Sequence, residues 1–167
     1  EENAEMLIDE KFQYGAVPVR VINLAISDMI EELGPNLWEK RLDRCVDFGH
    51  TFSPVIEMSN IPDLLHGEAV ALDCLYSSCI SFLRGYIVPD TLDRIFNLAK
   101  RLKLKTYHED FTNMELLQKS LADATKHRNG NQFAPLPIRI GNYTIVNDIK
   151  EDEMKKHEAF KKAMDKK

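Results

Sequence analysis

Apolar residues recur at spacings of three and four along the first half of the chain, which is the period of a helix with one buried face. The first stripe follows Pro18, a residue favoured in the first helical turn, and Gly34-Pro35 ends it. Its apolar members are Val21, Ile22, Ala25, Ile26, Met29, Ile30 and Leu33. A second helical segment is predicted from near Asp47 to residues 60–62, and a largely buried helix over residues 67–83.

The second half of the chain continues this period and then changes it. Pro89-Asp90 opens a helix that extends to Leu102, and Thr112 or Asn113 can cap the next helix, over residues 114–124. Residues 133–140, a Gly141-Asn142 turn and residues 143–146 then predict a hairpin. A charged helix containing Met154, Phe160 and Met164 is predicted to close the chain. The pattern predicts one mainly α domain over residues 1–167, with one small β-hairpin.

Composition narrows the class of protein. With 167 residues and 44% apolar residues, the chain is long enough for one domain with a core. The net charge is −5 and there is no long basic block, so neither a nucleic acid nor an anionic membrane is favoured as a partner. An odd set of three cysteines without framework spacing predicts a reduced, cytoplasmic compartment. Because the chain starts with Glu1-Glu2-Asn3, we interpret it as a piece of a longer protein.

Candidate chemistry gathers in two short segments. Asp47 and His50 are three residues apart and would share a face if they lay on one helix, and His66 directly precedes the buried apolar run. Histidine nitrogens and carboxylates are ligands that zinc prefers. Isolated histidines are more often capping or core residues, so spacing alone makes a metal site the minority interpretation.

Two motifs change that weighting. Asp47-Phe48-Gly49-His50-Thr51-Phe52-Ser53-Pro54 and His66-Gly67-Glu68-Ala69-Val70 resemble the two signature segments of the dehydroquinate synthase superfamily. The resemblance implies a helical C-terminal metal-binding domain in which His50 and His66 are zinc (or Co²⁺) ligands. It also implies an N-terminal NAD-binding domain that this chain lacks, and a third ligand, a glutamate, that matches no position here. We therefore expect the chain alone to be inactive.

Departures from the dehydroquinate synthase pattern suggest a different substrate. Asp47 stands where those enzymes usually have Asn, and Pro54 stands where they have a second His. With residues 36–39, these positions are more similar to the sedoheptulose 7-phosphate cyclases, which are NAD- and zinc-dependent lyases making 2-epi-5-epi-valiolone or desmethyl-4-deoxygadusol, a mycosporine precursor. Residues 56–58 and 127–132 slightly favour the deoxygadusol branch. The family resemblance further implies a homodimeric parent.

Lys126, His127 and Arg128 form a basic group before Asn129-Gly130. From the residues alone, a basic last turn that balances the helix dipole is the plainer interpretation. The resemblance implies instead that this segment binds the phosphorylated sugar substrate. It likewise implies that Asp47 is a catalytic residue that holds a substrate oxygen or supports the metal.

The remaining polar candidates are interpreted as structural. Glu68 suits a first helical turn, Glu57 is expected to face solvent, and Asp73 needs a partner that the sequence does not name. Cys74 and Cys79 suit core packing. Two alternatives to the cyclase stay open: a 3-dehydroquinate synthase, and a non-catalytic helical module that keeps the motifs as core elements.

Overall fold

A computed structural model describes residues 1–59 and 63–156. The helices are α1 (Ala4–Asp9), α2 (Ala16–Leu33), α3 (Ser53–Ser59), α4 (His66–Leu83), α5 (Pro89–Arg101) and α6 (Met114–His127). Short 3-10 turns are η1 (Gly34–Asn36), η2 (Cys45–Asp47) and η3 (Glu109–Thr112), and the strands are β1 (Ala134–Arg139) and β2 (Asn142–Val146). Residues 151–156 are helical, as predicted, whereas Phe160 and Met164 of the predicted closing helix lie outside the described residues. The predicted mainly α fold with one hairpin is confirmed.

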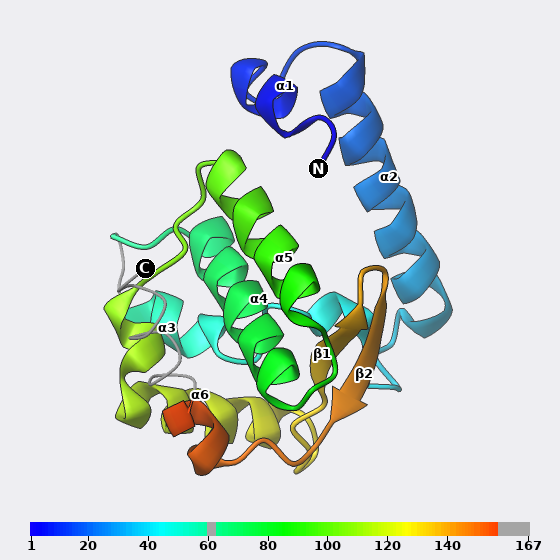
Figure 1. The fold of residues 1–167 in the computed structure, drawn as a ribbon. Coiled ribbons are helices and arrows are strands. Elements are labelled where there is room, and N and C mark those ends of the chain that lie inside the picture. The colour runs from blue at the N-terminus through cyan, green and yellow to red at the C-terminus, as the bar shows by residue number, and fades with distance from the viewer. Residues whose placement is uncertain (60–62, 157–167) are drawn as a thin grey trace.

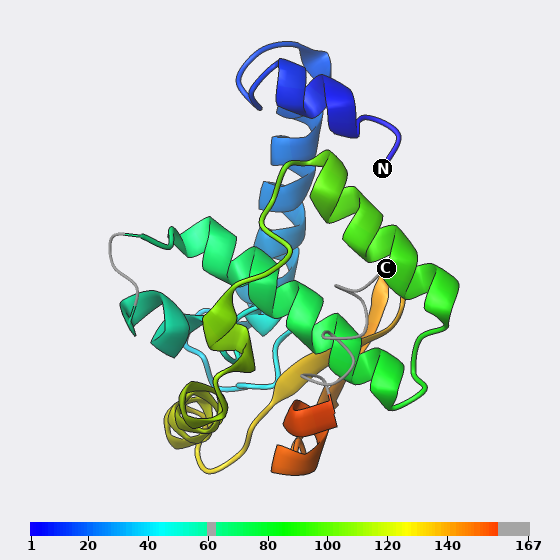
Figure 2. The same ribbon diagram turned by 60° about the vertical axis from the view of Figure 1, so that its left-hand side comes forward.

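Helix α4 runs through the middle of the molecule and organises the core. Helix α5 lies along one side of it, α3 and α6 lie on the other, and β1 passes beneath (Figures 1 and 2). Tyr76 of α4 is buried at the centre, with ring centres 4.8 Å from Phe52 and 5.8 Å from Phe111. The apolar run over residues 67–83 therefore forms the buried helix that its composition predicts.

The two strands pair antiparallel, with Ala134 opposite Val146. Gly141 supplies the left-handed φ of 78° that the tight turn requires. The predicted hairpin is confirmed, although β2 begins one residue earlier than expected, at Asn142. Asn113 caps α6, because its side chain accepts hydrogen bonds from two backbone N–H groups of the first turn.

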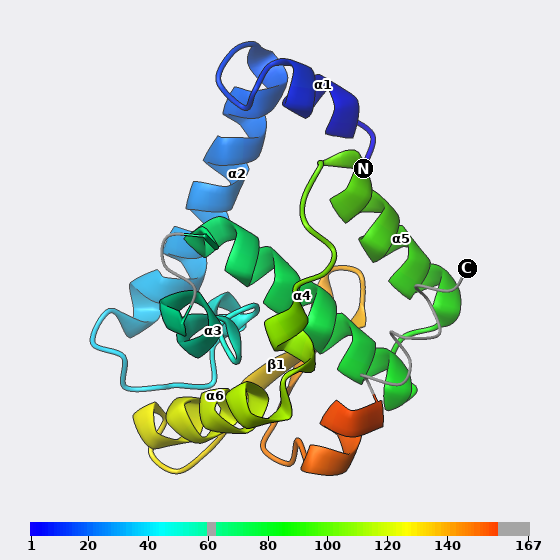
Figure 3. The same cartoon turned by 90° about the vertical axis from the view of Figure 1, so that its left-hand side faces the viewer.

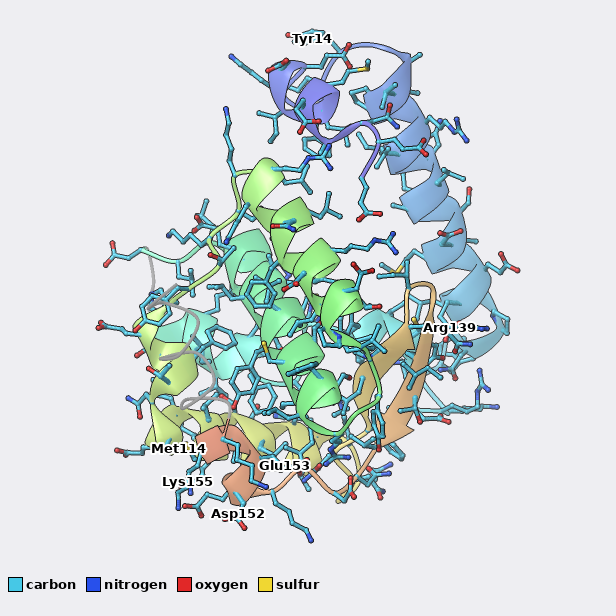
Figure 4. All side chains as sticks on the ribbon, viewed as in Figure 1. Tyr14, Met114, Arg139, Asp152, Glu153 and Lys155 are labelled. Atoms are coloured by element: carbon cyan, nitrogen blue, oxygen red, sulfur yellow. The ribbon has the colours of Figure 1, made fainter. Side chains whose placement is uncertain are left out.

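Helix α2 stands apart from the body (Figures 1 and 3). Its described neighbours α1 and η2 meet it near its two ends, and Figure 4 shows Tyr14 beside its start and Arg139 near its far end. The predicted apolar stripe is therefore mostly exposed, with Ile30 at 64%. Among the described residues, no helix combines the length and apolar character needed to cross a membrane.

The segment that carries Asp47 and His50 differs from the prediction. The predicted helical start near Asp47 is wrong, because η2 ends there, a turn follows and α3 begins only at Ser53. Gly49 has a φ of +84°, and a Cβ at this position would lie 2.7 Å from Cys74 Sγ and 2.9 Å from the Val70 carbonyl oxygen. Only glycine combines that backbone conformation with such close approach to α4. Asp47 and His50 therefore do not share a helix.

Arg84, the residue after α4, ties that helix to the end of the described chain. Its Nε lies 2.6 Å from Glu153 Oε1 and its NH1 lies 2.8 Å from Asp148 Oδ1. Figure 4 shows Glu153 at the bottom of the molecule, beside Asp152. Burial raises the pKa of Glu153, but the hydrogen bonds from Arg84 and the Lys150 N–H outweigh it and leave that pKa below its usual value. The Arg84 hydrogen bond also lowers the pKa of Asp148.

Replacing Arg84 with methionine should lower the free energy of unfolding at pH 7 by about 2 kcal/mol, since hydrogen bonds to charged groups contribute roughly 1.5–3 kcal/mol. A carboxylate with a lowered folded-state pKa stabilises the fold above its unfolded value, and that contribution disappears as the pH falls through the folded value. The difference between wild type and Arg84→Met should therefore shrink below about pH 4.5, measured by urea unfolding. Lys155→Met, which removes an exposed ion pair with Glu151, is the matched control and should change stability much less. A difference independent of pH would contradict the ionic explanation.

Candidate metal and substrate site

The two motif histidines come together although different elements carry them. His50 lies in the turn segment before α3, and His66 is the first residue of α4. Their ring centres are 5.5 Å apart, with ring planes inclined by 54°. The packing of α3 against α4 brings the two motifs together.

The donor chemistry of this pair fits a zinc ion. Two imidazoles on one tetrahedral zinc, with Zn–N distances of about 2.0–2.1 Å, have ring centres roughly 5 Å apart. The Nδ1 atom of His50 is buried and has no hydrogen-bond partner among the described residues. The Nδ1 atom of His66 lies 2.8 Å from Glu57 Oε2, which leaves its Nε2 available. No cluster of three or more His, Cys, Asp or Glu side chains that could hold a metal occurs within residues 1–59 and 63–156, so the described chain offers two ligands and no third.

A pocket of about 520 Å³ opens beside His50. Its wall combines the stretch before α3, the start of α3 and the end of α6. The lining residues are Glu39, Leu42, Arg44, Asp47, His50, Thr51, Pro54, Val55, Ser120, Asp123, Ala124, His127 and Arg128. Of the predicted site residues, Asp47, His50, His127 and Arg128 are thus brought together, whereas His66 and the exposed Lys126 do not line this pocket.

Asp47 lies between two arginines. Its Oδ1 is 2.9 Å from Arg44 NH2, and its Oδ2 is 3.3 Å from Arg128 NH2. All three side chains are largely buried, with 18% of Arg44 and 10% each of Asp47 and Arg128 exposed. Burial lowers the pKa of Arg128, and the Asp47 carboxylate acts in the opposite direction. The pair of guanidinium groups therefore holds the Asp47 carboxylate in place on a pocket wall that also carries the carboxylates of Glu39 and Asp123.

Arg128, predicted to bind substrate, makes several hydrogen bonds and an ionic contact to the protein itself. Besides Asp47, it donates to the His50 carbonyl oxygen at 3.1 Å and to the Gln132 carbonyl oxygen at 2.6 Å. His127, in contrast, has 71% of its side chain exposed, and its Nε2 lies 3.5 Å from Asp123 Oδ1. Among the predicted substrate-binding cations, His127 and Lys126 are thus the more accessible, and Arg128 is placed to hold Asp47 and the backbone of His50.

Asp73 has the partners that the sequence could not name. Its Oδ2 accepts hydrogen bonds from the backbone N–H groups of Phe52 at 2.6 Å and Ser53 at 2.8 Å, and its Oδ1 accepts one from the Ser77 hydroxyl at 3.1 Å. Burial raises the pKa of Asp73, against the opposing effect of these hydrogen bonds. The carboxylate fixes the backbone where α3 begins, two and three residues after His50.

Other candidates are accounted for by local contacts. Glu68 accepts from the Leu65 N–H at 3.1 Å and pairs with Lys105, so it has the structural role expected in a first helical turn. Burial raises the pKa of the Cys74 thiol to about 12, which does not favour a nucleophile. Sequence reasoning missed Arg44 and misplaced Glu57, which faces His66 instead of solvent. The only signals for them were an arginine three residues before Asp47 and a carboxylate nine residues before His66.

Comparison with known proteins matches residues 6–126 to the model of the 3-dehydroquinate synthase C-terminal family. A 2-epi-5-epi-valiolone synthase from an Actinoplanes species is 45% identical over 159 residues, covering 92% of this chain and 40% of the relative. A demethyl-4-deoxygadusol synthase from Trichormus variabilis is 34% identical over 147 residues, covering 88% of this chain and 36% of the relative. The chain thus spans about two fifths of the length of these curated relatives.

One solved structure shares the fold closely. It is a 2-epi-5-epi-valiolone synthase from Streptomyces hygroscopicus subsp. jinggangensis with NAD⁺ and Zn²⁺ bound, 37% identical and with a TM-score of 0.91. The match covers 99% of this chain and 45% of that one. The helices and the hairpin described above therefore have the arrangement found in that enzyme.

Proposed function

Because the chain belongs to the 3-dehydroquinate synthase C-terminal family, we propose that it is the metal- and substrate-binding part of a sugar phosphate cyclase that depends on NAD⁺ and Zn²⁺. The proposed substrate is sedoheptulose 7-phosphate, which loses phosphate as the carbon ring closes. The observation that carries the proposal is the meeting of His50 and His66, whose ring centres are 5.5 Å apart, beside a polar pocket that His50 lines.

Relatedness supports one product over the other. The Actinoplanes valiolone synthase is 45% identical to this chain and the Trichormus deoxygadusol synthase is 34% identical. We therefore favour 2-epi-5-epi-valiolone, against the slight preference that residues 56–58 and 127–132 gave for the deoxygadusol branch. The proposal extends to a cytoplasmic, homodimeric parent protein.

Each residue of the site has a separate proposed role that follows from its position. His50 and His66 would hold zinc through neutral nitrogens, and zinc, when bound, polarises a substrate hydroxyl while NAD⁺ supplies the hydride chemistry. Asp47 keeps free lone pairs beside its two arginine contacts, so its carboxylate can accept a hydrogen bond from a substrate hydroxyl. His127 and Lys126, accessible at the end of α6, suit the phosphate group.

Zinc binding by the 167-residue chain tests the proposed ligands directly. Wild-type chain should bind zinc, and His50→Ala and His66→Ala should each lose that binding. Two nitrogen ligands form only a weak zinc site, and a single remaining ligand is too few to hold the ion. Competition with a chromophoric chelator measures the affinity. His108→Ala is the matched control, since His108 contacts Asp110 in η3 and not the pocket.

Zinc uptake that is unchanged in both variants would favour the non-catalytic helical module.

The substrate is tested by fusing the N-terminal part of the Actinoplanes relative upstream of this chain and measuring phosphate release with NAD⁺ and zinc. Release from sedoheptulose 7-phosphate by the fusion, and none by the chain alone, is the expected result. Release only from the dehydroquinate precursor would identify a 3-dehydroquinate synthase instead.

A further inference from the structure

Glu57 presents its carboxylate to His66 across the gap between α3 and α4. The Oε2 atom of Glu57 lies 2.8 Å from Nδ1 of His66, within hydrogen-bond distance. The Glu57 side chain is 24% exposed and the His66 side chain is 65% exposed. Within the described chain, His66 Nδ1 is the one hydrogen-bond partner found for the Glu57 carboxylate. A partly buried carboxylate thus faces a ring that is mostly exposed and that also neighbours the His50 ring.

This contact determines which nitrogen of His66 carries the proton. An ionised carboxylate only accepts hydrogen bonds, so the N–H of a neutral imidazole beside it must be on Nδ1. The lone pair is then on Nε2, the nitrogen that remains free for a ligand. Carboxylates that orient metal-bound histidines in this way fix both the tautomer and the rotation of the ring.

The need for such a support differs between the two histidines. His50 sits on a backbone that is held on both sides, since its N–H donates to the Asp47 carbonyl oxygen at 2.9 Å and its carbonyl accepts from Arg128 at 3.1 Å. His66 begins a helix, and most of its ring has no packing around it. Its orientation therefore depends on Glu57 more than that of His50 depends on any one side chain.

We propose that Glu57 is a positioning residue that holds His66 in the tautomer and orientation needed to present Nε2 to zinc. The proposal rests on the proposed function for the metal, but the hydrogen bond that carries it is a property of the chain itself. In this proposal Glu57 acts through His66, because its Oε2 atom engages Nδ1 of the imidazole.

The test uses the whole chain and two readouts. Long-range ¹H–¹⁵N NMR of the metal-free protein, about two pH units above the usual histidine pKa of about 6.5, reports the tautomer of His66. Wild type should show Nδ1–H, Glu57→Ala should lose that preference, and Glu57→Gln should keep it, because an amide oxygen still accepts from Nδ1–H. Zinc affinity should fall about 10- to 100-fold in Glu57→Ala and by less in Glu57→Gln.

Glu68→Gln is the matched control, because it removes one nearby charge on α4 while leaving an acceptor for the Leu65 N–H. It should change neither readout. A wild-type tautomer and wild-type zinc affinity in Glu57→Ala would overturn the proposal. Loss of zinc binding in Glu57→Gln as complete as in His66→Ala would also overturn it, since Glu57 would then be a ligand. If no variant, wild type included, bound zinc while Glu57→Ala still lost the tautomer, the zinc site would fail and the positioning of His66 would stand.

Discussion

Replacing Asp47 with alanine is expected to destabilise the fold by about 3–5 kcal/mol, because removing one partner leaves a buried charge uncompensated. Arg128 is only 8% exposed, and Asp47 lies 3.3 Å from it. Without the carboxylate, Arg44 and Arg128 would also face each other as like charges across the site. The same substitution removes the oxygen that we propose as the acceptor for a substrate hydroxyl.

Asp47→Asn separates these two effects. The amide keeps an oxygen and the shape of the side chain, so urea unfolding should show a smaller loss than for alanine. In the fusion with the Actinoplanes N-terminal part, Asp47→Asn should still lower kcat by about 100-fold or more if the carboxylate acts on the substrate. Asp123→Ala, in the same pocket but 44% exposed, should cost under about 1 kcal/mol. Full activity of Asp47→Asn would exclude the proposed role for the carboxylate.

Asp73→Ala is expected to have a similarly large effect, about 3–5 kcal/mol, for a different reason. It would leave the buried N–H groups of Phe52 and Ser53 without acceptors, at roughly 1–3 kcal/mol each. A cavity in the fully buried α4 face adds to that cost. Because these N–H groups lie only two and three residues after His50, zinc affinity should fall as well.

Two further variants test the explanation given for the Asp73→Ala substitution. Asp73→Asn retains an oxygen for the two N–H groups, and its amide can donate to Ser77, so it should recover much of the stability. Ser77→Ala removes a single hydrogen bond of 3.1 Å and should cost about 1 kcal/mol. Thermal and urea unfolding measure both. A loss below 1 kcal/mol in Asp73→Ala would show that water or backbone movement satisfies the orphaned N–H groups.

Local pattern predicted the fold well where local forces decide it. The stripes of α2, α4, α5 and α6 and the break at the Gly141 turn were readable because helix period and turn chemistry are properties of neighbouring residues. The short helix α1 (Ala4–Asp9) was not predicted. The segment after Asp47 was misread because the left-handed conformation of Gly49 is selected by close contact with Cys74 and Val70, more than twenty residues away.

The candidate site was predictable only in part. Spacing alone left a metal as the minority interpretation for His50 and His66, and the resemblance of the two motifs supplied the pairing that the structure then brings to 5.5 Å. The supporting residues were hidden because their partners are set by tertiary packing. Asp73, for example, bonds to groups 20 and 21 residues away.

The contacts of Arg128 show that a chain can contain both histidine motifs and still lack part of the site. It bonds to the carbonyl of His50 across 78 residues of chain, while both histidine motifs end before residue 71. A polypeptide that ended after α5 would keep every residue of both motifs but would lose Arg128, one of the two cations that hold Asp47. A motif search would score such a truncated gene as intact, and a screen for the arginine beyond α6 would not.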